Sequence, residues 1–294
     1  MNILISGASG LIGSKVNQLL TKHGHTVLPL QRDTAQVPYW SIEQKKIQLS
    51  GHEKIDVVIH LAGENVAQGR WTAVKKERIL QSRKEGTRLV AEFFAEAAYK
   101  PRLIISASAT GFYGDRGDEE LDEESGKGGG FLADVSQAWE EATQPAKEAG
   151  IRVVNMRFGM VLSSDGGALT RILPLFKMGL GGPLGNGRQY MSWVALHDVT
   201  QAVLHSIKKE ELHGPVNIVA PHPVTNQQFT RVLGRVLCRP AFFPVPKFFL
   251  SLFLGEMAQE LLFASARVYP HKLQASGYTF AMPELESALQ SMLR

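Results

Sequence analysis

The sequence predicts an α/β fold in which a doubly wound parallel sheet precedes a smaller C-terminal α/β region. Three observations predict it. Over the first 160 residues, short apolar runs typical of strands alternate with segments whose apolar residues recur at helical spacing. A turn with glycines three apart follows the first run and opens the first helix, and after residue 160 glycine and proline become frequent. Such alternation is typical of a parallel sheet covered by helices on both faces.

The elements follow from local patterns. The first strand is expected at Ile3–Ile5, an apolar run that ends at Gly7. The segment Leu11–Leu20 has helical spacing, and Gly24 ends that helix before a second strand over Thr26–Leu30. Further strands are expected at residues 57–59, 103–105, 153–156 and 216–219, with one helix ending near Tyr99 and another over residues 198–207.

Two regions are expected. Residues 1–160 form a nucleotide-binding domain to which residues 195–220 return, and residues 161–294 form a smaller substrate or lid region rich in glycine and proline. The apolar stretch Phe248–Phe263 is interpreted as a buried helix, with docking on a membrane surface as the alternative.

Composition limits the function classes. The net charge of +4 is small and dispersed over 294 residues, which argues against a nucleic-acid partner. The single cysteine, Cys238, excludes an intrachain disulfide and is expected to be a buried apolar residue. Without a signal-like start or a long apolar span, we expect a cytoplasmic protein with no membrane partner. No His, Cys or Asp cluster has metal-ligand spacing, so no metal is expected.

The glycine turn Gly7-Ala8-Ser9-Gly10-Leu11-Ile12-Gly13 predicts a dinucleotide site. It follows a strand and opens a helix, which is the context that such a motif requires. One glycine permits the tight turn, another lets backbone amides approach a diphosphate, and the third lets the helix pack closely on the strand. The helix N-terminus then attracts the phosphates. The first domain is therefore expected to be of the Rossmann type.

The end of the second strand indicates which dinucleotide is bound. Sites for NAD usually place an acidic residue there, which accepts from the ribose hydroxyls. Here Gln31 and Arg32 follow Leu30. A neutral residue removes the repulsion of a 2′-phosphate, and a guanidinium can bind one through paired hydrogen bonds. Asp33 comes next and is expected to point away. The pattern therefore favours NADP over NAD.

Several further segments resemble the motifs of one enzyme family. They are Asp56-Val57-Val58-Ile59-His60-Leu61-Ala62-Gly63, Ser106-Ala107-Ser108-Ala109-Thr110-Gly111-Phe112-Tyr113-Gly114, Arg157-Phe158-Gly159, and the run Trp193, His197, Asp198, Val199. Together with the glycine turn they resemble extended short-chain dehydrogenases/reductases. In detail the chain resembles the atypical subgroup called epimerase family proteins, whose bacterial members are often labelled sugar-nucleotide epimerases or cell-division-inhibitor-like proteins.

The resemblance implies where the cofactor is bound. Gly7, Gly10, Leu11 and Ile12 are expected to line the diphosphate, and Arg32 to meet the 2′-phosphate. Leu61, Ala62 and Gly63 are expected to border the cofactor between adenine and nicotinamide. Arg83 stands where many members carry asparagine, and either approaches the diphosphate or is a solvated helix charge.

The sequence lacks one pair of catalytic residues that members of this family use. Members of the family use a tyrosine, and a lysine four residues later, to exchange a proton with the substrate during hydride transfer. None of the six tyrosines here has lysine at that spacing, and the expected positions are Phe131 and Val135. Ser108 remains, either orienting a substrate oxygen or as a strand-end hydrogen-bonding group. Tyr113 is the expected substitute acid. Other polar groups that could contribute are Glu64, Asn65 and Lys127.

The motifs and the missing catalytic pair lead to two alternative functions. The first is an NADP-dependent oxidoreductase or epimerase acting on a small polar substrate, such as a sugar nucleotide, bound near Trp193 and His197. The second is a non-catalytic NADP(H)-binding sensor or partner-binding protein that lost the acid. His197 and Asp198 are not expected to form a relay, because neighbours on a helix point apart; Asp198 is expected to cap the helix that follows. The substrate and the oligomeric state stay open.

Overall fold

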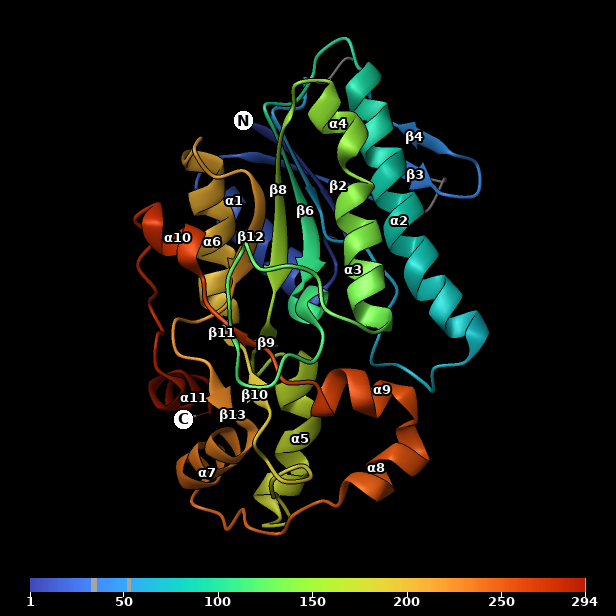
Figure 1. Ribbon diagram of the computed structural model, residues 1–294. Helices are drawn as coiled ribbons and strands as arrows, with labels where there is room; N and C mark the ends of the chain where they lie inside the picture. The colour runs from blue at the N-terminus through green and yellow to red at the C-terminus, as the bar shows by residue number, and fades with distance from the viewer. Residues whose placement is uncertain (33–35, 52–53, 294) are drawn as a thin grey trace.

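The computed structural model describes residues 1–32, 36–51 and 54–293. Its centre is a six-stranded parallel sheet with the order β12-β8-β6-β5-β1-β2 (Figure 1). These strands are β1 (Asn2–Ser6), β2 (Thr26–Leu30), β5 (Val57–His60), β6 (Leu103–Ala109), β8 (Arg152–Phe158) and β12 (Gly214–Ile218). Each overlaps an apolar run from which it was predicted, so the doubly wound α/β fold is confirmed.

Helices cover both faces of the sheet (Figure 1). One layer contains α1 (Leu11–Lys22) and α6 (Leu196–Lys208); the other contains α2 (Ala73–Glu96), α3 (Phe131–Glu141) and α4 (Gln144–Glu148). Alternate strand residues face the two layers. Ile3 and Ile5 pack in one core cluster with residues of α1 and α6, whereas Leu4 packs in a second cluster with residues of α2.

A short hairpin lies beside β2 and was not predicted. It consists of β3 (Tyr39–Ser41) and β4 (Lys46–Gln48), and Tyr39 forms a parallel bridge with Gln31. Trp40 at its centre is fully buried in the core cluster on the α2 face. The hairpin therefore covers the edge of the sheet next to the carboxyl end of β2.

The smaller region packs around a separate core. Its elements are β9 (Met160–Leu162), α5 (Gly167–Lys177), β10 (Tyr190–Met191), β11 (Trp193–Ala195), β13 (Val224–Thr225), α7 (Asn226–Leu237) and α11 (Leu285–Leu293). Trp193, Phe229 and Leu289 are fully buried there together. Between β11 and β13 the chain returns to the main sheet as α6 and β12.

Near the C-terminus, within the range assigned above to the smaller region, the chain packs against the main domain a second time. The strand β14 (Arg267–Val268) pairs with β7 (Glu120–Leu121), and α10 (His271–Ala275) follows. Tyr278 and Phe280 then pack against the core cluster on the α1 and α6 face. No local pattern marks this return, because it depends on a contact with α6.

That contact involves Asp198, whose expected role is wrong. Asp198 is buried, and α6 begins after Ala195 without a side-chain cap among the described residues. The Asp198 carboxylate instead accepts hydrogen bonds from Ala281 N (2.8 Å), Met282 N (3.0 Å) and the Tyr278 hydroxyl (2.9 Å). Asp198 therefore anchors the C-terminal segment rather than the start of its own helix.

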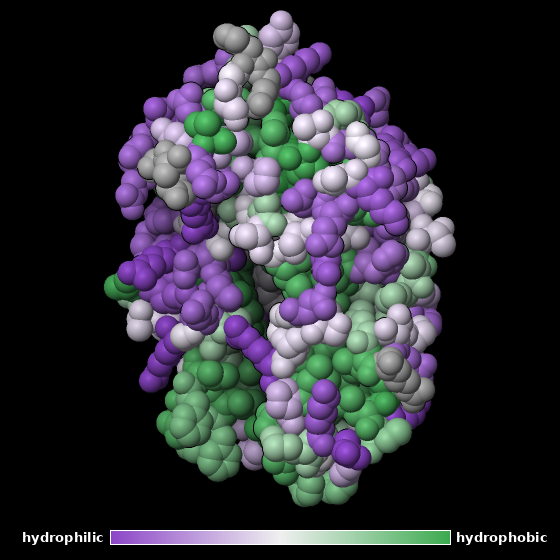
Figure 2. All heavy atoms as spheres, turned by 180° about the vertical axis from the view of Figure 1, so that it is seen from behind, coloured by the Kyte–Doolittle hydropathy of each residue, from purple (hydrophilic) through white to green (hydrophobic). Residues whose placement is uncertain are grey.

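The segment 248–263 is not the single buried helix that was expected. Gly255, at φ 59°, separates α8 (Lys247–Leu254) from the short α9 (Glu256–Ala258) and the π-helical turn η2 (Gln259–Phe263). Phe248 and Phe253 are 70% and 71% exposed. Figure 2 shows apolar residues gathered in this lobe at the lower left. Among the described residues, no helix combines the length and apolar character needed to cross a membrane.

Cys238 is also not buried as expected. It is exposed and adopts a left-handed conformation (φ 53°) as the C-cap residue of α7. Helices often end at a left-handed residue, and Cys238 has this role at the tip of α7.

Candidate cofactor-binding site

Two glycines of the turn between β1 and α1 are required by the protein's own packing. Gly7 has φ 72°, and a Cβ on it would lie 2.9 Å from Ala62 N. A Cβ on Gly13 would overlap Gly7 O. Gly7 therefore permits the turn and Gly13 permits close packing of α1 on it, as the spacing predicted.

Gly10 is different, because little protein surrounds it. A Cβ on Gly10 would meet only Gly7 O, at 3.3 Å. Gly10 is the N-cap of α1, and within the described ranges no side chain caps this helix and no acceptor meets the N–H groups of Leu11, Ile12 and Gly13. An uncapped helix N-terminus beside the open side of a glycine suits a diphosphate. The residues present therefore fit a dinucleotide.

The end of β5 lies against this turn. Leu61 N donates to Ser6 O (3.2 Å), and Ala62 N donates to the Ser6 hydroxyl oxygen (3.4 Å). The chain continues from β1 to β2 on one side, while β5 lies on the other side of β1. Ligands of open α/β sheets bind at the carboxyl edge of such a switch point. The structure thus brings Gly7 and the segment 61–63 together where the dinucleotide was predicted.

Arg32 lies two residues beyond the end of β2, on the same edge of the sheet. Its side chain is exposed, and its guanidinium carbon is 5.8 Å from the centroid of the Trp40 ring. Gln31 before it carries no charge, and Asp33 lies outside the described residues. The position of Arg32 suits contact with a phosphate on the adenosine ribose.

Arg83 on α2 forms part of the wall next to Gly63. Its Nη1 donates to the carbonyl oxygens of Glu64 (2.9 Å) and Ile79 (3.2 Å), and its guanidinium carbon is 4.8 Å from the centroid of the Trp139 ring. Burial lowers the pKa of Arg83 to about 10, and Glu64 partly opposes this. Arg83 is therefore not a solvated helix charge. Direct contact with the diphosphate stays a prediction.

Glu64 is fixed by α2. Its carboxylate pairs with Lys75 Nζ at 2.5 Å, and its backbone N donates to the Ser82 hydroxyl (3.0 Å). The hydrogen bond from Lys75 lowers the pKa of Glu64. Asn65 accepts from Ala67 N (2.9 Å) and holds its own turn. Both predicted polar contributors thus make contacts within the protein.

Ser108, at the carboxyl end of β6, belongs to a buried polar chain. Its hydroxyl donates to Glu140 Oε1 (2.7 Å), and Arg157 binds both carboxylate oxygens of Glu140, at 2.7 and 2.9 Å. Arg157 is buried, and its guanidinium carbon lies 3.6 Å from the centroid of the Phe112 ring. Glu140 raises the pKa of Arg157 against the effect of burial. The pair holds the Ser108 hydroxyl in one orientation.

Tyr113 does not have the position expected of a substitute acid. It ends the turn η1 (Thr110–Tyr113) and is fully buried. Its hydroxyl contacts Asp122 O (2.8 Å), Asn217 Oδ1 (2.8 Å) and Arg157 Nη1 (2.9 Å). Burial raises the pKa of Tyr113 to about 12. A phenol enclosed in this way cannot reach a substrate, so the prediction that Tyr113 is catalytic is corrected.

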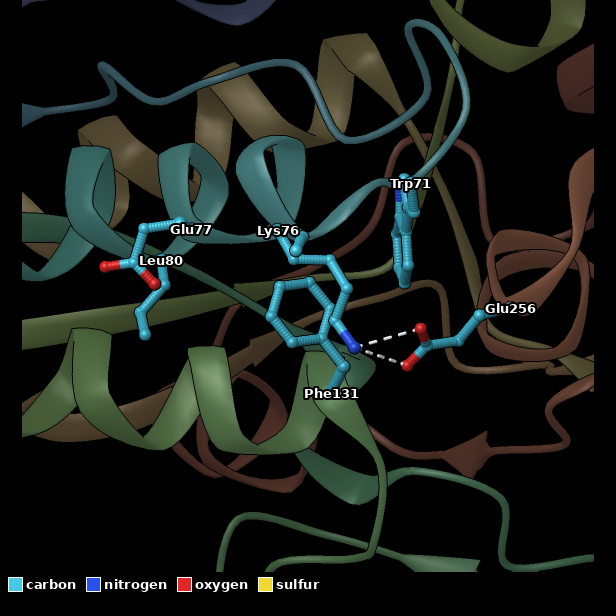
Figure 3. A pocket seen from close by; sticks show the side chains of 7 residues that line it. Trp71, Lys76, Glu77, Leu80, Phe131 and Glu256 are labelled. Atoms are coloured by element: carbon cyan, nitrogen blue, oxygen red, sulfur yellow. Dashed lines mark hydrogen bonds and ion pairs between the residues drawn. The ribbon is translucent and has the colours of Figure 1, made fainter.

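Phe131 and Val135 are packed among apolar side chains. Val135 is buried in a cluster with Trp71, Ile79 and Met257. Phe131 meets Trp71 edge-on, with ring centroids 5.1 Å apart, beside a surface hollow (Figure 3). At the two positions where the family resemblance predicts tyrosine and lysine, both the side chains, Phe131 and Val135, and their surroundings are therefore apolar.

The hollow is closed on one side by an ion pair. Lys76 Nζ lies 4.6 Å from the centroid of the Phe131 ring and 2.8 Å from Glu256 Oε1 (Figure 3). This pair joins α2 to α9, so the C-terminal region contacts one of the helices that cover this face of the sheet.

The residues expected near the substrate are not gathered together. Trp193 is fully buried, and its indole N–H donates to His222 O (3.1 Å), while His197 is exposed on α6. Lys127 pairs with Asp134 at 2.5 Å. Over the ranges that the structure describes, no group of three or more His, Cys, Asp and Glu side chains could hold a metal ion.

Several groups of the site were missed by sequence reasoning. The pairing of Glu140 with Arg157 and the contact of His60 with Ser6 were not predicted. The charge of Arg157 near the end of β8, a mostly buried strand, was a signal, because a buried charge requires a partner. Glu260, which binds the N-terminus of α3 from 128 residues away, gave no local signal.

Comparison with known proteins agrees with this geometry. A family model described as "NAD dependent epimerase/dehydratase family" matches residues 3–219, and a "Domain of unknown function (DUF1731)" matches residues 245–292. An epimerase family protein of Mycobacterium leprae is 40% identical over 290 residues, which are 98% of this chain and 94% of that protein. The epimerase family protein YfhF of Bacillus subtilis is 36% identical and covers 100% and 98%.

Solved structures show the same similarity. The crystal structure of human epimerase family protein SDR39U1 (isoform 2) with NADPH has a TM-score of 0.92, 31% identity and 99% coverage of both chains. A nucleoside-diphosphate sugar epimerase of Corynebacterium glutamicum has a TM-score of 0.82 and 34% identity, and the match covers 100% of this chain but 58% of that one.

Proposed function

The chain belongs to the NAD dependent epimerase/dehydratase family, and from this we propose that it is an NADP(H)-dependent oxidoreductase or epimerase of a small polar substrate. The observation that carries the proposal is the open cradle at Gly10, where an uncapped helix N-terminus meets the end of β5. Backbone N–H groups there would hold the diphosphate. When bound, the cofactor supplies hydride exchange at its nicotinamide ring.

The preference for NADP rests on the end of β2. The exposed guanidinium of Arg32 can bind a 2′-phosphate, and the neutral Gln31 does not repel one. The human relative of known structure was crystallised with NADPH, which supports the same choice.

This chain's residues would hold and orient the reactants. Leu61, Ala62 and Gly63 would border the cofactor. Ser108 is our candidate for orienting a substrate oxygen, because it lies at the carboxyl end of β6 and Glu140 fixes its hydroxyl. Phe131 and Val135 cannot exchange a proton, so an oxidoreductase reaction would need a proton donor other than these two side chains.

A second function is favoured by that same apolar packing. Val135 is buried among Trp71, Ile79 and Met257, and the Tyr113 hydroxyl is enclosed. A protein that binds NADP(H) as a sensor or partner-binding module would need neither a tyrosine nor a lysine there. A measurement of substrate turnover distinguishes the enzyme from the non-catalytic NADP(H)-binding protein.

The binding proposal is tested by calorimetric titration with NADPH. Gly10→Val should abolish binding while the protein stays folded, because its side chain would occupy the space of the diphosphate. Gly126→Val is the matched control, since a Cβ there meets nothing within 4 Å. Binding that survives in Gly10→Val would place the diphosphate elsewhere.

The catalytic proposal is tested by following NADPH absorbance with carbonyl and sugar-nucleotide substrates. If the protein is an oxidoreductase, Ser108→Ala should lower turnover by about a hundredfold or more and leave NADPH affinity unchanged. Tight NADPH binding without turnover on any substrate would favour the non-catalytic function instead.

A further inference from the structure

The lobe around α8 exposes an unusual number of large apolar side chains. Six of them are more than half exposed: Phe242, Phe243, Phe248, Phe249, Leu252 and Phe253. We call these six residues the aromatic patch. Figure 2 shows the apolar surface of this lobe at the lower left. Single exposed apolar residues are ordinary, whereas a continuous apolar surface marks a binding site.

The patch is formed by α8 and by the segment that precedes it. On α8 the exposed positions 248, 249, 252 and 253 follow helical spacing, while Leu254 points inward to the cluster around Trp71. The Phe242 and Phe243 rings lie 4.5 Å apart, and the segment that carries them pairs with the loop after α5, where Val245 N donates to Pro183 O (2.9 Å). Met178 and Leu180, also more than half exposed, precede this paired loop.

The segments that carry the patch are basic and poor in acidic residues. The sequence has no aspartate or glutamate between residues 166 and 197 or between residues 212 and 255. Lys177, Arg239 and Lys247 lie at the edge of the patch and are exposed. Arg239 Nε donates to Lys177 O (3.0 Å), which keeps two of them together. Glu256, the acid that follows α8, pairs with Lys76.

We propose that the aromatic patch docks on an anionic lipid surface. Phenylalanine rings enter the boundary between headgroups and acyl chains, while nearby lysines and arginines bind anionic headgroups. A second copy of the chain fits less well, because an isologous contact would bring the basic edge against itself. The docking is peripheral and does not need the bound cofactor.

The lobe is attached firmly enough to act as a docking element. Lys76 binds both carboxylate oxygens of Glu256, at 2.8 and 2.9 Å, which joins α9 to α2. The Glu260 carboxylate accepts from the backbone N of Phe131 and Leu132, each at 3.1 Å, which joins η2 to α3. Docking of the patch would therefore orient the whole molecule on the lipid surface.

The test is co-sedimentation of the full chain with vesicles of phosphatidylcholine alone or mixed equally with phosphatidylglycerol. We expect binding to the anionic vesicles that falls at high salt. Phe249→Ser with Phe253→Ser should lower the partition coefficient at least tenfold, because two rings no longer leave water. Lys177→Gln with Lys247→Gln should lower it roughly twenty-five-fold, at about fivefold for each charge.

Matched controls use the same changes elsewhere. Tyr99→Ser removes another exposed aromatic ring, and Lys22→Gln with Lys208→Gln removes two exposed charges at the ends of α1 and α6. Both controls should bind like the wild type. Absence of binding to anionic vesicles, or equal loss in the controls, would overturn the proposal. So would a dimer in sedimentation analysis that Phe249→Ser with Phe253→Ser dissociates, because the patch would then be a protein interface.

Discussion

Two basic side chains near the carboxyl edge of the sheet differ in their surroundings. Arg32 is exposed, whereas His60 is buried with its Nδ1 2.7 Å from the Ser6 hydroxyl oxygen. Burial, and to a smaller degree the charge of Arg32, lowers the pKa of His60 to about 4. A neutral His60 fixes Ser6, whose hydroxyl oxygen accepts from Ala62 N. Arg32 is thus our candidate for recognising the ligand, whereas His60 supports the site from within.

Arg32→Glu should weaken NADPH binding by roughly tenfold to a hundredfold, because it removes a charge-assisted hydrogen bond and adds repulsion. NADH affinity should stay the same or rise. Fluorescence titration with both nucleotides measures this. Lys46→Glu makes the same charge change on the neighbouring hairpin and should have little effect. Equal NADPH affinity in Arg32→Glu and wild type would remove Arg32 from the site.

His60 should make stability depend on pH. In the folded protein the pKa of His60 is lowered from 6.5 to about 4, so between these values the unfolded chain binds a proton that the folded chain does not. Its contribution is therefore fully present above pH 6.5 and is lost as pH falls toward 4, by about 3 kcal/mol in all. Urea unfolding of wild type and His60→Asn at pH 7 and pH 5 measures the difference. A variant with an unchanged pH slope would refute it.

At the scale of elements, the start of α3 joins several parts of the molecule. Gly130 precedes the helix at φ 105°, and a Cβ there would overlap the Glu260 carboxylate. That carboxylate caps α3 from the C-terminal region, where a side chain of the preceding loop usually does so. Phe131 and Val135 then pack toward α2 and α9. The first turn of α3 is thus shaped by packing between elements.

Restoring the family's tyrosine and lysine should have unequal effects. Phe131→Tyr should change stability little, because Phe131 is only half-buried and borders a hollow. Val135→Lys should destabilise the fold by about 3 kcal/mol or more, since an ammonium would enter the cluster of Trp71, Ile79 and Met257. Thermal unfolding measures both. A stable double variant with new turnover on a carbonyl substrate would show that the helix tolerates the family's pair.

At the scale of the whole molecule, the chain crosses repeatedly between its two parts. Residues 196–218 return to the main sheet, and residues 267–280 pack against the main domain. The elements α8 to η2 contact α2 and α3 through Glu256 and Glu260. The last return depends on Asp198, which binds Tyr278, Ala281 and Met282. Burial and the Asp198 charge both raise the pKa of Tyr278. The two parts are therefore expected to unfold together.

Asp198→Ala should destabilise the whole protein by about 3–5 kcal/mol, because three hydrogen bonds lose a charged acceptor that is itself buried. The exposed neighbour His197→Ala is the control and should change stability by less than about 0.5 kcal/mol. Denaturant unfolding gives the loss, and hydrogen exchange should show it first in residues 278–293. If Asp198→Ala unfolds like wild type, the C-terminal return has another anchor.

Local chemistry was enough to predict the sheet and the dinucleotide turn. Each strand of the main sheet carries its own apolar run, and the glycines of the turn act on neighbours within a few residues, as the contacts of Gly13 with Gly7 show. The family motifs are equally short. For the same reason the sequence indicated that Phe131 and Val135 replace the usual catalytic pair, since identity alone shows that neither can exchange a proton.

Only the tertiary structure decided which side chains are accessible. Tyr113 and Asn217 are 104 residues apart, and Asp198 binds groups more than 80 residues away, so no local pattern could reveal that one is enclosed and the other an anchor. The aromatic patch shows the converse, because α8 has the composition of a core helix yet lies at the surface. Burial is a property of everything that packs around a residue, and long-range contacts set it.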